Sequence, residues 1–240
     1  MTTPVDVRRS ADRFVTRRPG VLSRHSFSFG SHYDSRNTSY ALLLACNEEV
    51  VDAGAGFEPH PHRDVEVVTW VLEGALQHED STGSSGLLTP GTAQRMSAGG
   101  GVVHAERNAG AAPLRFVQTW VRPDGSSRTP SYEQQEVESS ALSASLVAVA
   151  SGRPSDGAAV RLGQRDAAFL VGRLGIGRSV LLPDAPWLHL FVATGSVDLE
   201  AAGPVLAGDA VRLTGGGGQH LTALAPAEVL VWAMRSDGTG

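Results

Sequence analysis

The chain repeats one order of apolar segments and glycine turns in its two halves. The first half reads VLEGAL, then LLTPGTAQRMSAGGG, then LRFVQTWV, and the second reads VATGSV, then PVLAGDAVRLTGGGG, then AEVLVWAM. Each copy offers a strand, a glycine turn, a second turn, a glycine run and a closing apolar strand. We therefore expect two similar β units, residues 1–135 and 136–240, with the Ser-, Glu- and Gln-rich stretch 124–145 as the connection.

Short apolar runs dominate over helical periodicity. Val65–Leu72, Leu114–Val121 and Leu188–Ala193 are bounded by Gly, Pro, Asp and Ser, a pattern typical of β-sandwiches and barrels. The 28 glycines and 13 prolines also fit a turn-rich β protein. The sequence predicts an all-β fold, with a short helix near Ala141–Ala148 or Gln164–Ala168.

Composition excludes several classes of function. The net charge of -5 argues against direct binding of nucleic acid, and the absence of lysine excludes a P-loop. Apolar segments are too short to span a membrane, and no apolar stretch follows the N-terminal arginines, so we expect a cytoplasmic protein without a signal peptide. Cys46 is the single cysteine, which excludes an intrachain disulfide and a thiolate metal cluster. Its apolar neighbours indicate a small buried side chain.

Four residues form a candidate metal-binding set. His60 and His62 are separated by two positions, and His104 and Glu106 repeat that spacing 42 residues after His62. On a β-strand, side chains at positions i and i+2 point to the same face. If both strands line one barrel, three imidazoles and one carboxylate converge.

Such a donor set suits one divalent transition metal with positions open for water, oxygen or substrate. Calcium would require more carboxylates, and structural zinc sites are usually closed and rich in thiolates. Iron(II), nickel, manganese, copper and catalytic zinc all remain compatible with these ligands.

The same motifs carry a family resemblance. The segments PHPHRDVEVVTWVLEG, HEDSTG and PGTAQRMSAGGGVVHAERN resemble the pirin family of the cupin superfamily, and in particular bacterial pirin-like proteins associated with quercetin 2,3-dioxygenase activity. The resemblance covers most of residues 20–135 and only the general layout of the remainder. It implies a bicupin, with two jelly-roll β-barrels packed face to face. It also implies a metal, commonly iron, held by His60, His62, His104 and Glu106.

Glu66 competes with Glu106 for the carboxylate position. Generic cupins take a glutamate shortly after the HxH motif, and the parity of Glu66 with His62 predicts an inward direction. Pirins use the glutamate of HxE, so the resemblance favours Glu106 as the ligand. Glu66 is then expected in the pocket or beside a histidine, orienting it through its free ring N–H.

The second repeat serves as an internal comparison. Local alignment on the glycine turns places Leu181, Pro183, Leu221 and Ala223 where the four ligands stand in the first repeat. The second unit is therefore expected to be a barrel without metal ligands. The remaining histidines receive structural interpretations: His189 and His220 as structural residues of the second unit, His25 and His32 as part of a packed N-terminal strand, and His78 as the solvated end of a hairpin.

Two functions follow as expectations. The resemblance implies a dioxygenase that takes a small aromatic substrate, a flavonol-like enol or phenol, together with dioxygen. In that reaction Glu106 would accept the substrate hydroxyl proton while the histidines hold the metal. The alternative is a metal-dependent regulatory protein that acts through a protein partner, since no DNA-reading motif is present.

Overall fold

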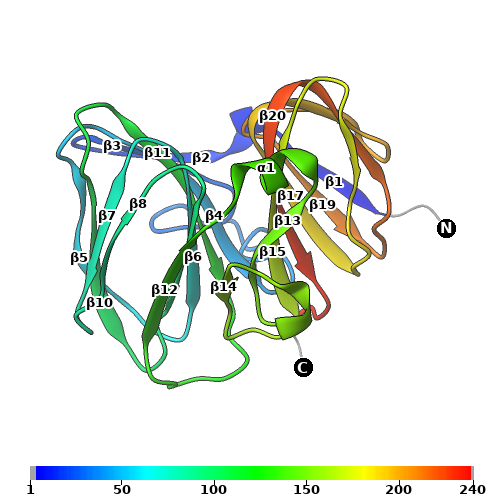
Figure 1. Cartoon of the computed structure of the whole chain (residues 1–240). Coiled ribbons are helices and arrows are strands. Elements are labelled where there is room, and N and C mark those ends of the chain that lie inside the picture. The colour runs from blue at the N-terminus through cyan, green and yellow to red at the C-terminus, as the bar shows by residue number, and fades with distance from the viewer. Residues whose placement is uncertain (1–3, 239–240) are drawn as a thin grey trace.

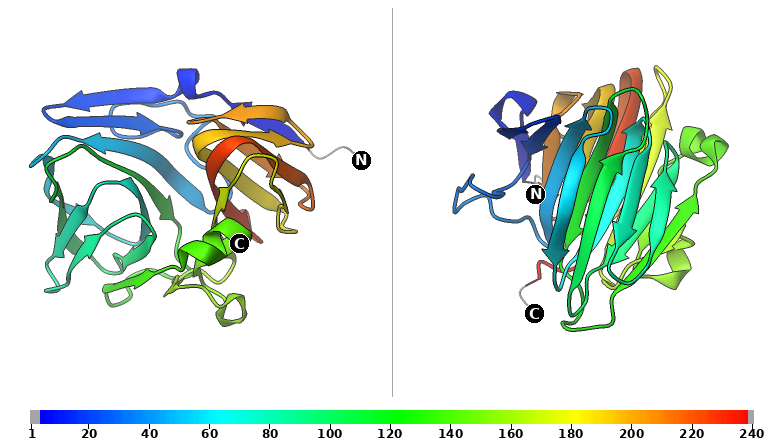
Figure 2. Two further views of the ribbon diagram at one scale, coloured as in Figure 1. Left: turned by 45° about the horizontal axis from the view of Figure 1, so that its top comes forward. Right: turned by 90° about the vertical axis from the view of Figure 1, so that its left-hand side faces the viewer.

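The computed structural model describes residues 4–238 and divides them into two β units that lie side by side (Figure 1). The strands of the first unit are β2 (Phe14–Arg18), β3 (Val21–His25), β4 (Leu43–Val51), β5 (Gly56–His62), β6 (Glu66–Glu73), β7 (Leu76–Asp80), β8 (Ser85–Leu88), β9 (Thr92–Ser97), β10 (Val102–Asn108), β11 (Leu114–Val121) and β12 (Ser131–Glu136). They form a seven-stranded sheet of order β12-β9-β6-β11-β4-β3-β2 and a four-stranded sheet of order β5-β10-β7-β8. Figure 2 shows these two sheets curling toward each other.

The second unit consists of one nine-stranded sheet. Its strands are β1 (Val5–Arg8), β13 (Val147–Ser151), β14 (Val160–Arg161), β15 (Ala167–Leu174), β16 (Ser179–Leu181), β17 (Trp187–Leu199), β18 (Gly203–Leu206), β19 (Ala210–Thr214) and β20 (His220–Met234). The helical elements are α1 (Ser139–Ala144) and two 3-10 turns, Ser10–Asp12 and Pro154–Asp156. The all-β prediction is confirmed, although the sheets of residues 4–238 do not close into continuous hydrogen-bonded barrels.

Strand pairing differs from the predicted organisation at two places. Strand β1 pairs with β19, so Val5–Arg8 extends the sheet of the second unit although it begins the chain (Figure 1). Strand β12 pairs with β9, so Ser131–Glu136 is part of the first unit's sheet rather than a loose connection. Of the two helix positions predicted, the first corresponds to α1, whereas Ala167 already begins strand β15.

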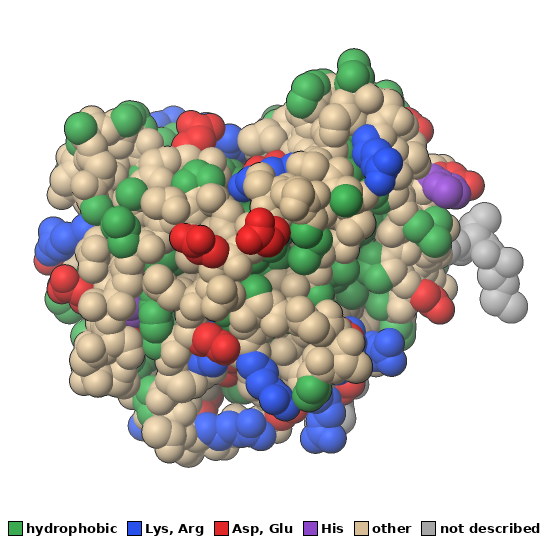
Figure 3. All heavy atoms as spheres, in the orientation of Figure 1, with side chains coloured by type: hydrophobic (Ala, Val, Ile, Leu, Met, Phe, Trp, Pro, Cys, Tyr) green, Lys and Arg blue, Asp and Glu red, His purple; other side chains and the backbone are tan. Residues whose placement is uncertain are grey.

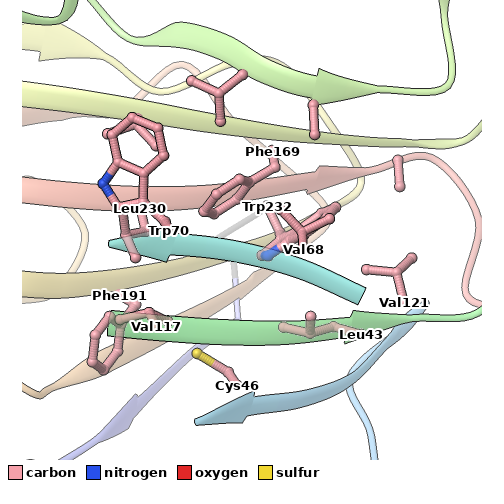
Figure 4. Close-up of a cluster of buried hydrophobic side chains, with 14 of the residues drawn as sticks. Leu43, Cys46, Val68, Trp70, Val117, Val121, Phe169, Phe191, Leu230 and Trp232 are labelled. Carbon is pink, nitrogen blue, oxygen red and sulfur yellow. The ribbon is translucent and has the colours of Figure 1, made fainter. Parts of the chain in front are cut away.

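One apolar cluster joins the two units. Trp70 of β6 packs among buried side chains of the second unit, including Phe169, Phe191 and Trp232 (Figure 4). Cys46 lies fully buried in the same cluster, as predicted. Because this face of β6 is covered by the second unit and its other face by the first unit's interior, the strand is buried on both sides.

No helix among residues 4–238 combines the length and the apolar character needed to cross a membrane.

Candidate metal centre

The register between β5 and β10 brings the two candidate ligand pairs together. These strands are antiparallel neighbours, with His104 opposite His60 and Val102 opposite His62. Residues directly opposite in an antiparallel pair share a face of the sheet. The ring centroid of His104 lies 4.4 Å from that of His60 and 4.8 Å from that of His62. The ligand nitrogens of the three histidines all lie within 4.8 Å of one another.

Nε2 of each of the three rings has no hydrogen-bond partner among residues 4–238. Nδ1 of His60 lies 2.8 Å from the carbonyl oxygen of Glu58 and donates to it, which leaves Nε2 as the lone-pair atom. Nε2 of His62 and Nε2 of His104 are buried without a hydrogen-bond partner. Burial lowers the pKa of His62 to about 4 and that of His104 to about 2, so both rings are neutral near pH 7. Buried nitrogens without partners are costly, and a bound cation would satisfy them.

Glu106 lies on β10 beyond an irregularity that shifts the register after His104. Its carboxylate is buried, and Nε2 of Gln118 lies 2.9 and 3.0 Å from its two oxygens. Burial raises the pKa of Glu106 to about 7, although the hydrogen bond from Gln118 acts to lower it. A carboxylate oxygen of Glu106 lies within 4.8 Å of ring nitrogens of His78 and His104, and these three residues form a second group that could hold a metal and that shares His104 with the first.

His78 corrects one expectation. The sequence predicted a solvated hairpin end, but the ring is fully buried, because β7 pairs with β10 and places His78 opposite Glu106. Its Nδ1 lies 3.4 Å from Nδ1 of His104, and its Nε2 lies 3.2 Å from a carboxylate oxygen of Asp80. The ring stacks on Tyr132 with centroids 4.6 Å apart.

Glu66 also lies elsewhere than expected. Its carboxylate accepts hydrogen bonds from Oγ of Ser97 at 2.8 Å and from the backbone N–H of Gly163 at 2.9 Å, and it forms no hydrogen bond with a histidine among residues 4–238. The approach is so close that a Cβ at Gly163 would lie 2.7 Å from this carboxylate. The inward prediction was wrong because even-numbered residues of β6 face the second unit, and Glu66 belongs to that face.

A cavity of about 1040 Å³ lies at the candidate metal centre and is lined in part by His60, His62 and Glu106. Its aromatic walls are Phe29, Phe57, Phe116 and Trp120.

Two wall residues were missed by sequence reasoning. Trp120 sets its ring edge-on against His62 with centroids 4.8 Å apart and donates from Nε1 to Oε1 of Gln118 at 3.2 Å. Gln118 in turn holds Glu106. The motif QTW carries the period-2 signal, since Gln118 and Trp120 occupy alternate positions of one strand.

The packed N-terminal strand predicted around His25 is present as β3. The ring of His25 also lines the cavity. Nδ1 of His25 lies 3.0 Å from Oδ1 of Asn47, Nε2 lies 2.8 Å from Oγ1 of Thr16, and the ring stacks on Phe29. His32 stacks on Phe14, as expected for a packing role.

Within residues 4–238, both groups of side chains that could ligate a metal belong to the first unit. Leu221 and Ala223 instead belong to the apolar core of the second unit. On β16 the buried residue is Val180, whereas Leu181 is 56% exposed, so the local alignment of the repeats is shifted by one position here. The interior remains apolar in either alignment.

The two histidines of the second unit take no part in these groups. His189 is fully buried beside the ring of Phe27, and burial lowers its pKa to about 3. His220 is exposed at the start of β20.

The chain is similar to known proteins over nearly its whole length. The family model described as Pirin matches residues 7–121. A protein of Mycobacterium tuberculosis named "Putative quercetin 2,3-dioxygenase Rv0181c" is 52% identical over 237 residues, which cover 98% of this chain and 97% of that protein. "Quercetin 2,3-dioxygenase" of Escherichia coli is 37% identical over 133 residues, covering 55% of this chain and 58% of that protein.

Solved structures of a bacterial pirin share the fold of this chain. YhhW from Escherichia coli superposes with a TM-score of 0.89 at 26% identity, covering 97% of this chain and 98% of that one. The complex of bacterial pirin YhhW with nickel(II) superposes with a TM-score of 0.88 at 26% identity, covering 97% and 100%. Near-complete coverage at 52% identity, together with the match to the family model, shows that the chain belongs to the pirin family.

Proposed function

We propose that the protein is a metal-dependent dioxygenase that acts on a flavonol-like substrate or on another enol or phenol. The observation that carries this proposal is the pair of buried, unpartnered Nε2 atoms of His62 and His104 beside an aromatic-walled cavity. The names of the relatives support dioxygenase chemistry. A large apolar pocket with a few convergent polar groups is the usual form of a small-molecule site.

The donor set fits one divalent transition metal. His60, His62, His104 and Glu106 would hold it through three neutral nitrogens and one carboxylate, a set that suits iron(II) and equally nickel, manganese, copper or zinc. We favour iron(II), and the nickel complex of YhhW is consistent with a site that accepts other ions. When bound, such an ion supplies Lewis acidity toward the substrate hydroxyl and a redox partner for dioxygen.

The residues of this chain perform the remaining tasks. The walls that include Phe57 and Trp120 would stack against a flat substrate ring and exclude water from it. Glu106 would accept the hydroxyl proton, because its carboxylate lines the cavity on the same strand as His104. Gln118 fixes the direction of that carboxylate.

Arginine and acidic side chains are interspersed on the face that Figure 3 shows. Proteins that bind nucleic acid usually concentrate basic residues in a stripe or patch.

The test combines metal analysis with oxygen uptake. The metal of the purified protein is determined by elemental analysis, and oxygen consumption with quercetin is compared between wild type, His62→Ala and the control His220→Ala, which changes an exposed histidine of the second unit. We expect His62→Ala to lose both metal and uptake and His220→Ala to retain both. Iron-loaded wild type that consumes no oxygen with any flavonol or catechol would refute the enzyme proposal. Retention of metal and activity by His62→Ala would refute the site assignment.

A further inference from the structure

A hydrogen-bonded series of three buried side chains, His104, His78 and Asp80, leads away from the candidate metal centre. Nδ1 of His104 lies 3.4 Å from Nδ1 of His78, and Nε2 of His78 lies 3.2 Å from Oδ2 of Asp80. The side chains of His78 and Asp80 are 0% and 2% exposed. No step of the proposed reaction uses either residue.

The ring protons of His78 and His104 can be assigned by starting from Asp80. An ionised carboxylate only accepts hydrogen bonds, so Nε2 of His78 must carry the proton that faces Asp80. Nδ1 of a neutral His78 is then a lone pair and must accept. His104 therefore donates from Nδ1, and its lone pair is confined to Nε2, the atom that is buried without a partner near His60 and His62.

We infer that Asp80, acting through His78, sets the tautomer of His104 so that Nε2 is the atom presented to the metal. The inference rests on the proposed function in one respect, that His104 is a metal ligand. Histidine ligands commonly donate their second ring N–H to a carboxylate or carbonyl, which fixes the ring and strengthens the ligand. Here the carboxylate would act through an intervening imidazole, and His78 and Asp80 are positioning residues.

Asp80 is itself held by the turn that follows β7. Its Oδ1 accepts hydrogen bonds from the backbone N–H of Thr82 at 2.8 Å, from Oγ1 of Thr82 at 2.6 Å and from the backbone N–H of Ser84 at 3.2 Å. These donors leave only Oδ2 to face His78. Tyr132 stacks on the His78 ring from β12 and restricts its rotation.

This asymmetry predicts a specific effect of Asp80→Asn. The three donors at Oδ1 would keep the amide oxygen of asparagine in that place, so the amide nitrogen would face His78. The amide would then donate to Nε2 of His78, moving the His78 proton to Nδ1. His104 would have to accept at Nδ1 and carry its own proton on Nε2, the form that cannot bind a metal there.

The first test needs no metal. Long-range proton–nitrogen NMR spectra of metal-free protein labelled with ¹⁵N-histidine report which ring nitrogen carries the proton. We expect His104 to be protonated on Nδ1 in wild type and on Nε2 in Asp80→Asn. The matched control is Glu79→Gln, a charge-neutralising change at the exposed neighbouring residue, which should leave the wild-type pattern. A wild-type His104 protonated on Nε2, or an unchanged tautomer in Asp80→Asn, would overturn the inference.

The second test measures affinity for Ni²⁺ by competition with a chromophoric chelator. Asp80→Asn and His78→Phe, which retains a ring against Tyr132, should each weaken binding about 10- to 100-fold, the usual effect of losing a partner behind a metal ligand. Glu79→Gln should bind like wild type. Equal affinity of Asp80→Asn and wild type would count against the inference. If wild type binds neither nickel nor iron, the proposed function fails, whereas the tautomer spectra of the metal-free protein still decide the role of Asp80.

Discussion

The amide nitrogen of Gln118 lies within hydrogen-bonding distance of both carboxylate oxygens of Glu106, at 2.9 and 3.0 Å. Oε1 of the same Gln118 accepts from Trp120, whose ring borders His62. One side chain of β11 thus orients the candidate carboxylate ligand and connects it with the wall of the cavity.

Replacement of Gln118 should weaken the metal centre. In Gln118→Met, a side chain of similar volume no longer donates to Glu106, so we expect affinity for Ni²⁺ to fall about 10- to 100-fold. Isothermal titration calorimetry measures this change. Gln135→Met, at an exposed position of β12, is the control and should bind like wild type. Unchanged affinity of Gln118→Met would mean that Glu106 does not depend on this hydrogen bond.

Removal of Trp70 should destabilise the contact between the units. Its ring is fully buried in the shared core, and Nε1 donates to a carboxylate oxygen of Glu228 at 2.5 Å. Large-to-small changes of buried aromatic residues cost about 3–5 kcal/mol, so Trp70→Ala should lower the free energy of unfolding by that amount. Urea denaturation checks this, with Tyr33→Ala as the control at a side chain that is 76% exposed. A loss no larger than that of the control would contradict the proposed packing role.

The buried carboxylate of Glu48, on β4, pairs with two arginines. Its carboxylate lies 2.8 Å from Nη1 of Arg13 and 2.8 Å from Nε of Arg115. Burial acts to raise the pKa of Glu48, but the two guanidinium groups outweigh it and the pKa is lowered. A lowered pKa means that the ionised form stabilises the fold above the ordinary value of 4.5 and that this contribution disappears as the pH falls.

Glu48→Gln should therefore cost about 3–5 kcal/mol near neutral pH, because it leaves Arg13 buried without its carboxylate. The difference from wild type should shrink as the pH falls below the ordinary carboxyl pKa. Denaturation curves between acid and neutral pH provide the measurement. Glu58→Gln breaks the exposed pair with Arg107 and should cost less than about 1 kcal/mol. Equal losses in the two variants would contradict this prediction.

Glu49 should produce the opposite dependence on pH. The side chain is buried, with one oxygen lacking a hydrogen-bond partner, and burial raises its pKa to about 8. Between the ordinary value of 4.5 and about 8, the unfolded chain releases this proton while the folded chain retains it. The fold therefore loses up to about 1.4 kcal/mol of stability for each pH unit in that window.

Glu49→Gln should abolish this loss, because glutamine does not ionise. The variant should therefore gain stability relative to metal-free wild type as the pH rises from about 5 to about 8. Thermal melts at several pH values test it. Glu136→Gln, at an exposed position of β12, should run parallel to wild type. A constant difference between Glu49→Gln and wild type would show that Glu49 ionises in the folded protein as it does in the unfolded chain.

The sequence by itself determined the β class and the candidate ligand pairs. The geometry of any β-strand puts the two members of an i, i+2 pair on one face, which is why His60, His62 and His104 could be chosen as candidates before the fold was known. That the two pairs meet depends on the register between β5 and β10. The single cysteine likewise excluded a thiolate metal cluster without reference to structure. These properties depend on local spacing and composition alone.

Tertiary structure decided what surrounds those residues. A period of two says which side chains share a face but not which face is the interior, and β6 is buried on both sides, so the direction of Glu66 could not be predicted. The register between β7 and β10 places His78 against His104, whereas the turn residues that follow it in the sequence indicated a solvated end. Pairing between strands depends on contacts distant in sequence, and the physical role of His78 and Asp80 is visible only once that pairing is known.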